Sequence, residues 1–267
     1  GREGYEFYAG TSYRHLLIWQ NGEVITLAQP HDVLGQEIGQ YLPGDTMLRK
    51  MMEKSYQILV DHPINLERKK QGLNPANSCW FWGAGTRPSL SSFEEKTGLK
   101  GAMVSAVDLL KGIAVGASMK TVFVEGANGG LHTNYRGKAQ AAVDVLTEEN
   151  YDFVYVHVEA PDEMGHQGSA EKKVQAIQFL DGQVIAPIKE GLEQAGEEFR
   201  MMVLPDHPTP ICIRTHTGDD VPYLLYDSTK PQAHTWKYNE REAAKSGFHI
   251  SKGCELINYL IGSGFKK

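Results

Sequence analysis

Five aspartate and histidine residues follow strand-like stretches of the sequence or lie in a neighbouring loop. They are Asp162, His166, Asp206, His207 and His216. Imidazole and carboxylate groups are ligands that zinc and manganese accept, and magnesium binds where oxygen ligands dominate. Two such ions can clamp the attacking and leaving oxygens of a phosphoryl group. The set therefore indicates a binuclear metal site that serves phosphoryl transfer.

The same residues also allow a plainer interpretation. A single D-x-x-x-H spacing, such as Asp162 to His166, is weakly specific. An Asp-His pair after a strand, such as Asp206-His207, can simply cap a turn. Spacing alone leaves both interpretations open.

Strand-like and helix-like stretches alternate in the second part of the chain, which predicts an α/β fold with a largely parallel sheet. The expected strands are residues 119–125, 151–160, 199–204 and 221–227, and the expected helices are 136–146 and 170–195. The long helix should place Val174, Ile177, Val184, Ile188 and Leu192 on roughly one face. Ligands of such sheets bind beyond the carboxyl ends of the strands, where the five residues fall.

The first part of the chain has a different pattern. Residues 13–28 suggest two short strands joined at Gln20-Asn21-Gly22, and residues 45–60 suggest a helix. Proline and aromatic residues interrupt the pattern over 61–98. We therefore expect a smaller domain with its linker at 1–97 and the metal-binding core at 98–267. The Asp61-His62-Pro63 string echoes Asp206-His207-Pro208, but we interpret this as coincidence.

Bulk composition narrows the class of protein. The 267 residues can form one large domain or two smaller ones, and 41% hydrophobic with 22% charged residues is typical of a soluble globular protein. A net charge of -6 argues against a nucleic-acid partner. No apolar run approaches the roughly 18 residues of a membrane span. The scattered Cys79, Cys212 and Cys254 suggest neither a disulfide framework nor a thiolate site, which fits a cytoplasmic protein.

Longer strings carry a family resemblance. HVEAPDEMGHQG (157–168), LPDHPTP and RTHTGDDVPY (within 204–223) resemble the ligand motifs of the alkaline phosphatase superfamily. FYAGTSYRHLLIW, WFWGAGTRPSL and GLKGAMVSAVDLLKGIA resemble the archaeal-type, cofactor-independent phosphoglycerate mutases. The likeness runs from about Tyr5 to the C-terminus.

This resemblance implies a fold, a reaction and cofactors. The fold would be an alkaline-phosphatase-like, largely parallel sheet flanked by helices, with a smaller α+β insert domain that closes over the substrate. The reaction would be the glycolytic isomerisation of 3-phosphoglycerate and 2-phosphoglycerate through a phosphoserine intermediate. It would use two divalent ions (Mn, Zn or Mg) and no 2,3-bisphosphoglycerate.

The resemblance also assigns ligands. Asp162, His166 and His216 would hold one metal, and Asp206 with His207 would hold the other. In the family the second metal also takes an N-terminal Asp and the nucleophilic Ser, in a segment that would precede Gly1. We therefore expect this chain to be a fragment that is inactive alone and needs that segment to complete its site.

Contacts to an anionic, phosphorylated carboxylate substrate should come from basic residues. Lys111 lies in the family-like VSAVDLLKG segment and could reach the phosphoryl group as a catalytic residue. Arg14, His15 and Arg87 could close over the substrate from the smaller domain. For each of these residues, a surface role such as an ion pair stays an equal alternative.

Two further stretches near the expected site could be either functional or structural. The Gly126–Gly130 loop precedes His132, Arg136 and Lys138 but lacks the Gly-Lys-Ser/Thr ending of a P-loop, so we expect a structural turn that leads into a helix. His157 and Glu159 alternate on one expected strand face and could support the metal ligands, with simple packing as the alternative.

Two other functions remain open. The first is that of a metal-dependent phosphatase or another phosphotransferase of the same superfamily, because the metal ligands alone do not determine which molecule accepts the phosphoryl group. A non-catalytic metal-binding protein is the second.

Overall fold

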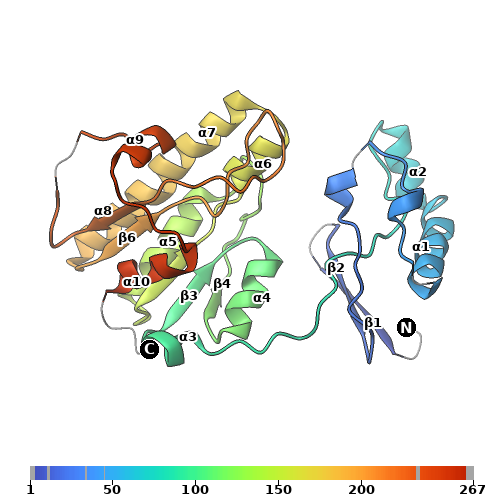
Figure 1. Cartoon of the computed structure of the whole chain (residues 1–267), viewed down its shortest axis with the longest axis horizontal. Helices are drawn as coiled ribbons and strands as arrows, with labels where there is room; N and C mark the ends of the chain where they lie inside the picture. The colour runs from blue at the N-terminus through green and yellow to red at the C-terminus, as the bar shows by residue number, and fades with distance from the viewer. Residues whose placement is uncertain (1–3, 11–12, 34, 45, 233–234, 263–267) are drawn as a thin grey trace. The chain divides into compact units, whose positions relative to one another are not determined.

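The computed structural model describes residues 4–10, 13–33, 35–44, 46–232 and 235–262. The chain divides into two compact units, Gly1–Pro88 and Ser89–Lys267. Figure 1 shows the elements of each unit, coloured along the chain. The positions of the two units relative to each other are not determined, so each is described by itself.

The first unit combines one hairpin with short helices. Its elements are β1 (Tyr5–Ala9), β2 (His15–Trp19), the 3-10 turns Pro30–Val33 and Gly39–Tyr41, α1 (Thr46–Leu59) and α2 (Pro63–Lys70). The expected helix at 45–60 is confirmed as α1, which buries Leu48 and Met52 one turn apart. His62 begins α2, because its Nδ1 accepts a hydrogen bond from the Ile64 amide at 3.3 Å. The Asp61-His62-Pro63 string is thus a helix start.

The expected hairpin around Asn21-Gly22 is wrong. The two strands of this unit are β1 and β2, paired antiparallel with Tyr5 opposite Trp19, and both precede Asn21. Asn21 adopts a left-handed φ of 56°, and a Cβ at Gly22 would lie 2.3 Å from the Trp19 ring. The Asn-Gly pair therefore makes a tight turn over Trp19 that ends β2, and residues 22–28 form no second strand.

The second unit contains the predicted parallel sheet. The strand order is β4 (Lys120–Val122), β3 (Gly101–Val104) and β5 (Phe153–Val156), all parallel. A separate antiparallel pair joins β6 (Arg200–Val203) to β7 (Leu224–Asp227). The α/β class is confirmed, although the central strand β3 was not predicted. All four residues of β3 are buried, so it shows no alternation of apolar and polar residues.

Helices pack on this sheet and form the core. They are α3 (Phe93–Thr97), α4 (Asp108–Gly116), α5 (Tyr135–Thr147), α6 (Ala160–His166), α7 (Ala170–Leu180), α8 (Ala186–Ala195), α9 (Glu240–Lys245) and α10 (Leu256–Ile261). The main buried cluster joins α5, α6, α7 and α8 to the inner side chains of β5. Small residues such as Ala139, Ala142 and Ala176 let these helices approach closely.

The long helix expected at 170–195 is interrupted. A π-helical turn at Asp181–Ile185 separates α7 from α8. Val184, Ile188 and Leu192 are buried as predicted, but Val174 and Ile177 are about half exposed. The wider π turn rotates the buried stripe, because it adds a residue to one turn of the helix.

The division between the units falls earlier in the chain than the expected 97/98 boundary. Residues 89–97 belong with the second unit. Phe93 of α3 stacks on Phe153 of β5 with ring centroids 4.9 Å apart, and its amide donates to the Ala117 carbonyl at 2.7 Å. The functions expected for the two domains stay predictions.

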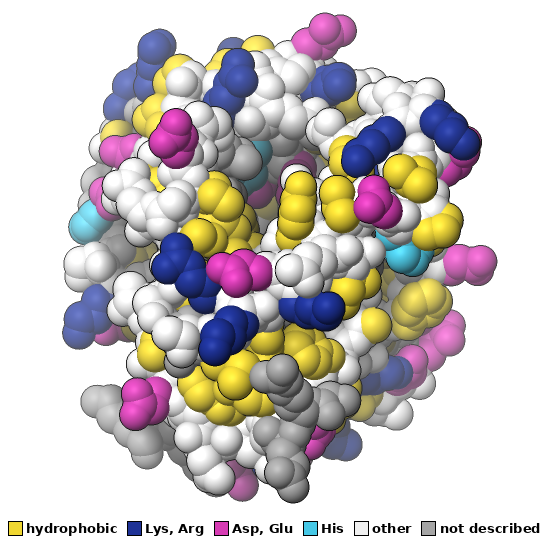
Figure 2. All heavy atoms as spheres, turned by 90° about the vertical axis from the view of Figure 1, so that its right-hand side faces the viewer, with side chains coloured by type: hydrophobic (Ala, Val, Ile, Leu, Met, Phe, Trp, Pro, Cys, Tyr) yellow, Lys and Arg dark blue, Asp and Glu magenta, His cyan; other side chains and the backbone are white. Residues whose placement is uncertain are grey.

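Hydrophobic side chains are also present on the surface. Figure 2 shows them among Lys, Arg, Asp and Glu side chains on the face that it presents. No helix in the described part of the chain is both long and apolar enough to cross a bilayer.

Candidate metal centre

The first pair of predicted ligands lies on α6, directly beyond β5. Asp162 and His166 are one turn apart on this short helix, so their side chains share a face. Pro161 and the acidic residues Asp162 and Glu163 suit the first turn of a helix. Gly165 is required on the adjoining face, since a Cβ there would lie 2.5 Å from the carbonyl oxygen of Thr209. Glycine thus lets α6 approach the loop after β6.

That loop supplies the other three predicted ligands. Asp206 and His207 come soon after β6, and a turn at residues 211–213 brings the chain back to His216. The Thr217 amide donates to the Pro208 carbonyl at 3.1 Å, which closes the loop. Arg214 has a left-handed φ of 61°, and its carbonyl oxygen contacts His166 of α6.

The structure brings all five residues together, and we call them the Asp-His cluster. His166 Nε2 lies 3.2 Å from Asp162 Oδ2 and 3.1 Å from His216 Nε2. His216 Nε2 is 3.4 Å from Asp162 Oδ1, and the His207 and His216 rings have centroids 3.7 Å apart. His207 Nε2 in turn lies 3.4 Å from Asp206 Oδ2. The cluster joins two segments that are some 50 residues apart in sequence.

The chemistry of these donors fits a divalent cation. His166 Nδ1 lies 2.9 Å from the Arg214 carbonyl oxygen, which can only accept a hydrogen bond. In a neutral His166 ring, Nε2 therefore carries the lone pair, and it faces a carboxylate and a second imidazole. Among the described residues, Asp162, His207 and His216 also offer ligand atoms that all lie within 4.8 Å of one another. The division of the cluster between two metals stays a prediction.

Electrostatics favours the neutral, ligating form of one histidine. Burial lowers the pKa of His216, and the neighbouring His207 lowers it further, while Asp162 opposes the change. A histidine must be neutral to offer its lone pair to a metal. His216 is therefore available as a ligand near neutral pH.

Two residues that the sequence analysis did not select support the cluster. Thr209 is buried, with 4% of its surface exposed, and its hydroxyl donates to Asp162 Oδ1. Lys173 on α7 donates to the Thr209 carbonyl at 2.7 Å. A hydroxyl two residues after an Asp-His pair was the available signal for Thr209. No signal in the sequence pointed to Lys173, because its hydrogen-bond partner Thr209 is 36 positions away.

The predicted substrate contacts lie in both units. Lys111 is on α4 of the second unit, where its Nζ lies 3.2 Å from Asp108 Oδ1. Arg14 lies over the Tyr13 ring in the first unit, His15 Nδ1 accepts from the Gly10 amide at 3.2 Å, and Arg87 is exposed. Since the units are described separately, a common site for these four residues stays a prediction.

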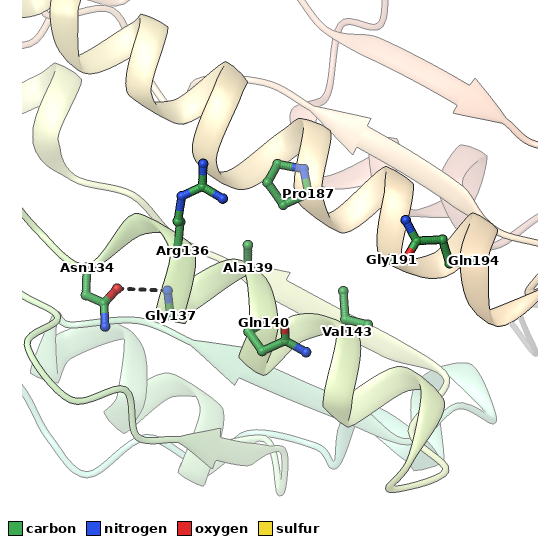
Figure 3. A pocket seen from close by; sticks show the side chains of 9 residues that line it. All are labelled: Asn134, Arg136, Gly137, Ala139, Gln140, Val143, Pro187, Gly191 and Gln194. Carbon is green, nitrogen blue, oxygen red and sulfur yellow. Dashed lines mark hydrogen bonds between the residues drawn. The ribbon is translucent and has the colours of Figure 1, made fainter.

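The glycine-rich loop before α5 is a structural turn, as expected. His132 and Arg136 are exposed whereas Lys138 is fully buried, so their side chains do not converge on one phosphate. Asn134 instead begins α5 by accepting from the Gly137 amide at 2.8 Å (Figure 3). Arg136 lines a pocket between α5 and α8 that shares no residue with the Asp-His cluster (Figure 3).

Comparisons with known proteins identify the family of the chain. The profile of the Metalloenzyme superfamily matches residues 19–260. A 2,3-bisphosphoglycerate-independent phosphoglycerate mutase of Methanosarcina mazei is 44% identical, over 98% of this chain and 67% of its own length. A probable enzyme of the same name from Geobacter sulfurreducens is 43% identical, over 98% of this chain and 66% of its own length. The chain thus spans about two thirds of the length of these relatives.

Two solved structures resemble the chain. A Pyrococcus horikoshii protein has a TM-score of 0.61 at 34% identity, over 75% of this chain and 52% of that one. The cofactor-independent phosphoglycerate mutase of Thermoplasma acidophilum, at 24% identity and a TM-score of 0.50, covers 96% of this chain and supports the fold alone. The chain belongs to the Metalloenzyme superfamily and to the family of 2,3-bisphosphoglycerate-independent phosphoglycerate mutases.

Proposed function

We propose that the protein interconverts 3-phosphoglycerate and 2-phosphoglycerate with divalent cations held by the Asp-His cluster. One observation carries the proposal: in a chain of this family, two carboxylates and three imidazoles from α6 and the loop after β6 converge within contact distance. Nitrogen and carboxylate donors together favour manganese or zinc over magnesium.

The ligand roles follow the family assignment. Asp162, His166 and His216 would hold one ion, and Asp206 with His207 would contribute to the other. When bound, such ions neutralise charge on phosphoryl oxygens and lower the pKa of a coordinated hydroxyl. Thr209 and the Arg214 carbonyl orient Asp162 and His166 for this task.

Basic residues would bind the substrate. We propose that Lys111 contacts the phosphoryl group, because it lies on α4, which follows the carboxyl end of β3. Arg14, His15 and Arg87 are our candidates for the remaining substrate oxygens, because they are basic residues of the first unit. A phosphoserine intermediate, a role in glycolysis and a cytoplasmic location belong to the same proposal.

An assay of the protein expressed from its full reading frame tests the function. With Mn²⁺ present, 3-phosphoglycerate should yield 2-phosphoglycerate, detected by coupling to enolase, and EDTA should abolish the reaction. Asp162→Asn should lower turnover by at least 100-fold, about 3 kcal/mol of transition-state stabilisation. Asp220→Asn, at an aspartate of the same loop whose side chain is 85% exposed, should leave turnover unchanged.

The products separate the competing functions. Release of inorganic phosphate without 2-phosphoglycerate would show a phosphatase instead of a mutase. If neither product forms while Mn²⁺ still binds, the remaining function is that of a non-catalytic metal-binding protein.

A further inference from the structure

A fully buried lysine contacts the segment that leads from β5 into α6. Lys138 on α5 is 0% exposed, and its Nζ donates to the His157 carbonyl at 3.0 Å. Burial lowers its pKa to about 8, an effect that Glu159 opposes and Lys111 reinforces. Its neighbours in the core, Ala139 and Ala142, are apolar, and an apolar side chain would avoid the cost of burying a charge. The ammonium group therefore calls for a role besides packing.

The partner of Lys138 lies where the ligand-bearing segment leaves the sheet. His157 follows β5 directly, and its amide donates to the Val104 carbonyl at the end of β3, at 2.9 Å. Its Nδ1 lies 3.5 Å from the hydroxyl of Ser105, which also accepts from the Val107 amide at 3.0 Å. His157 thus connects α5, the exit of β3 and the turn that leads into α6.

Glu159 extends this link to the predicted ligands. Its carbonyl accepts from the Asp162 and Glu163 amides at 3.0 and 3.1 Å, so it begins α6. Its carboxylate lies against Gly129, where a Cβ would approach within 2.2 Å of Oε2. Lys138 therefore acts at both ends of the short turn from His157 to Glu159, by a hydrogen bond at one and by charge at the other.

We propose that Lys138 is a positioning residue for the metal centre: its hydrogen bond to His157 holds the β5–α6 turn, and through that turn the side chains of Asp162 and His166. The proposal rests on the proposed function, since it assigns to Lys138 the geometry of that centre. Lys138 is not one of the predicted ligands, so it would act only through them.

Cobalt binding to the folded chain tests the proposal without measuring turnover. Lys138→Met keeps an unbranched, flexible side chain, one heavy atom shorter, but removes the ammonium. Val145→Ala is the matched control, because Val145 lies two turns further along α5, is 1% exposed and has no polar role. Co²⁺ affinity would be measured by titration of its visible absorption, with the unfolding of each variant followed in urea.

The expected results for the two variants are opposite. Lys138→Met should bind Co²⁺ about 10-fold more weakly with altered absorption bands, while unfolding at no lower urea concentration than Val145→Ala. Val145→Ala should be less stable than wild type but bind Co²⁺ with unchanged affinity. A purely structural lysine would instead give affinity losses that follow stability.

Unchanged Co²⁺ affinity in Lys138→Met would overturn the positioning role and leave the proposed function standing. Failure of the wild-type chain to bind Co²⁺ would overturn both. Lys138→Gln, shorter but polar, replaces Lys138→Met if that variant does not fold, with the same expected loss and the same refuting result.

Discussion

The hydroxyl of Thr209 offers a sharp test of the metal centre. Thr209→Val keeps the shape of a side chain that is only 4% exposed but removes the donor to Asp162 Oδ1. A hydrogen bond to a charged group contributes about 1.5–3 kcal/mol, and outer partners of metal ligands change affinity by about 10- to 100-fold. Since Asp162 faces both His166 and His216, its misorientation should weaken Mn²⁺ binding by about 10-fold, or about 1.4 kcal/mol.

Calorimetric titration of Mn²⁺ into the folded chain measures this loss. Thr209→Ser is the matched control, because it keeps the hydroxyl and loses only a methyl group. The Lys173 bond to the Thr209 backbone carbonyl survives both substitutions, so the loop should stay in place. Equal Mn²⁺ affinity in wild type, Thr209→Val and Thr209→Ser would refute the argument that this hydroxyl orients Asp162.

Three further outcomes are expected. Gly165→Ala should lower the free energy of unfolding by about 1–3 kcal/mol, because its Cβ would meet the Thr209 carbonyl at 2.5 Å. The control Gly182→Ala should cause no loss, because a Cβ there would have nothing within 4 Å. Equal urea midpoints for the two variants would contradict this. Asn134→Ala should cost about 1 kcal/mol in the same assay, since it removes the cap of α5, and a loss below 0.3 kcal/mol would be inconsistent with that cap. Burial lowers the pKa of Lys138 from 10.5 to about 8, so the unfolded chain binds a proton that the folded chain lacks between these values. The stability of wild type relative to Lys138→Met should therefore rise between pH 8 and 10.5, by up to about 3 kcal/mol, and a flat difference would speak against the shift.

The parts of the fold that were predictable from sequence have strong local patterns. α1 shows a clear helical period, and the alternation of strands with helices indicated the α/β class. β3 was missed because its four residues are all buried and carry no period. The Asn21-Gly22 turn was misassigned because a local turn signal does not say which neighbouring segments pair.

The candidate site shows the same limit. Its aspartates and histidines could be selected because their types suggest metal chemistry. Thr209 was passed over although it lies two residues after the Asp-His pair, and Lys138 was considered only with the glycine-rich loop. Their partners lie 47 and 19 positions away, so the sequence did not show which groups they contact. Side chains that orient a site therefore depend on tertiary contacts that no single stretch of sequence encodes.

The hydrogen-bond acceptor that orients His166 is a main-chain carbonyl. Evolution or design must therefore preserve the backbone conformation there and not a particular side chain. The Arg214 carbonyl orients the ring, and it belongs to a residue with a left-handed φ of 61°. Exchange of the Arg214 side chain cannot delete that oxygen, whereas a carboxylate partner could be lost in a single substitution. Position 214 is thus under pressure for backbone shape: glycine or asparagine would relieve the torsional cost, and a β-branched residue would raise it. The tautomer of a predicted metal ligand is in this way protected by the geometry of a turn.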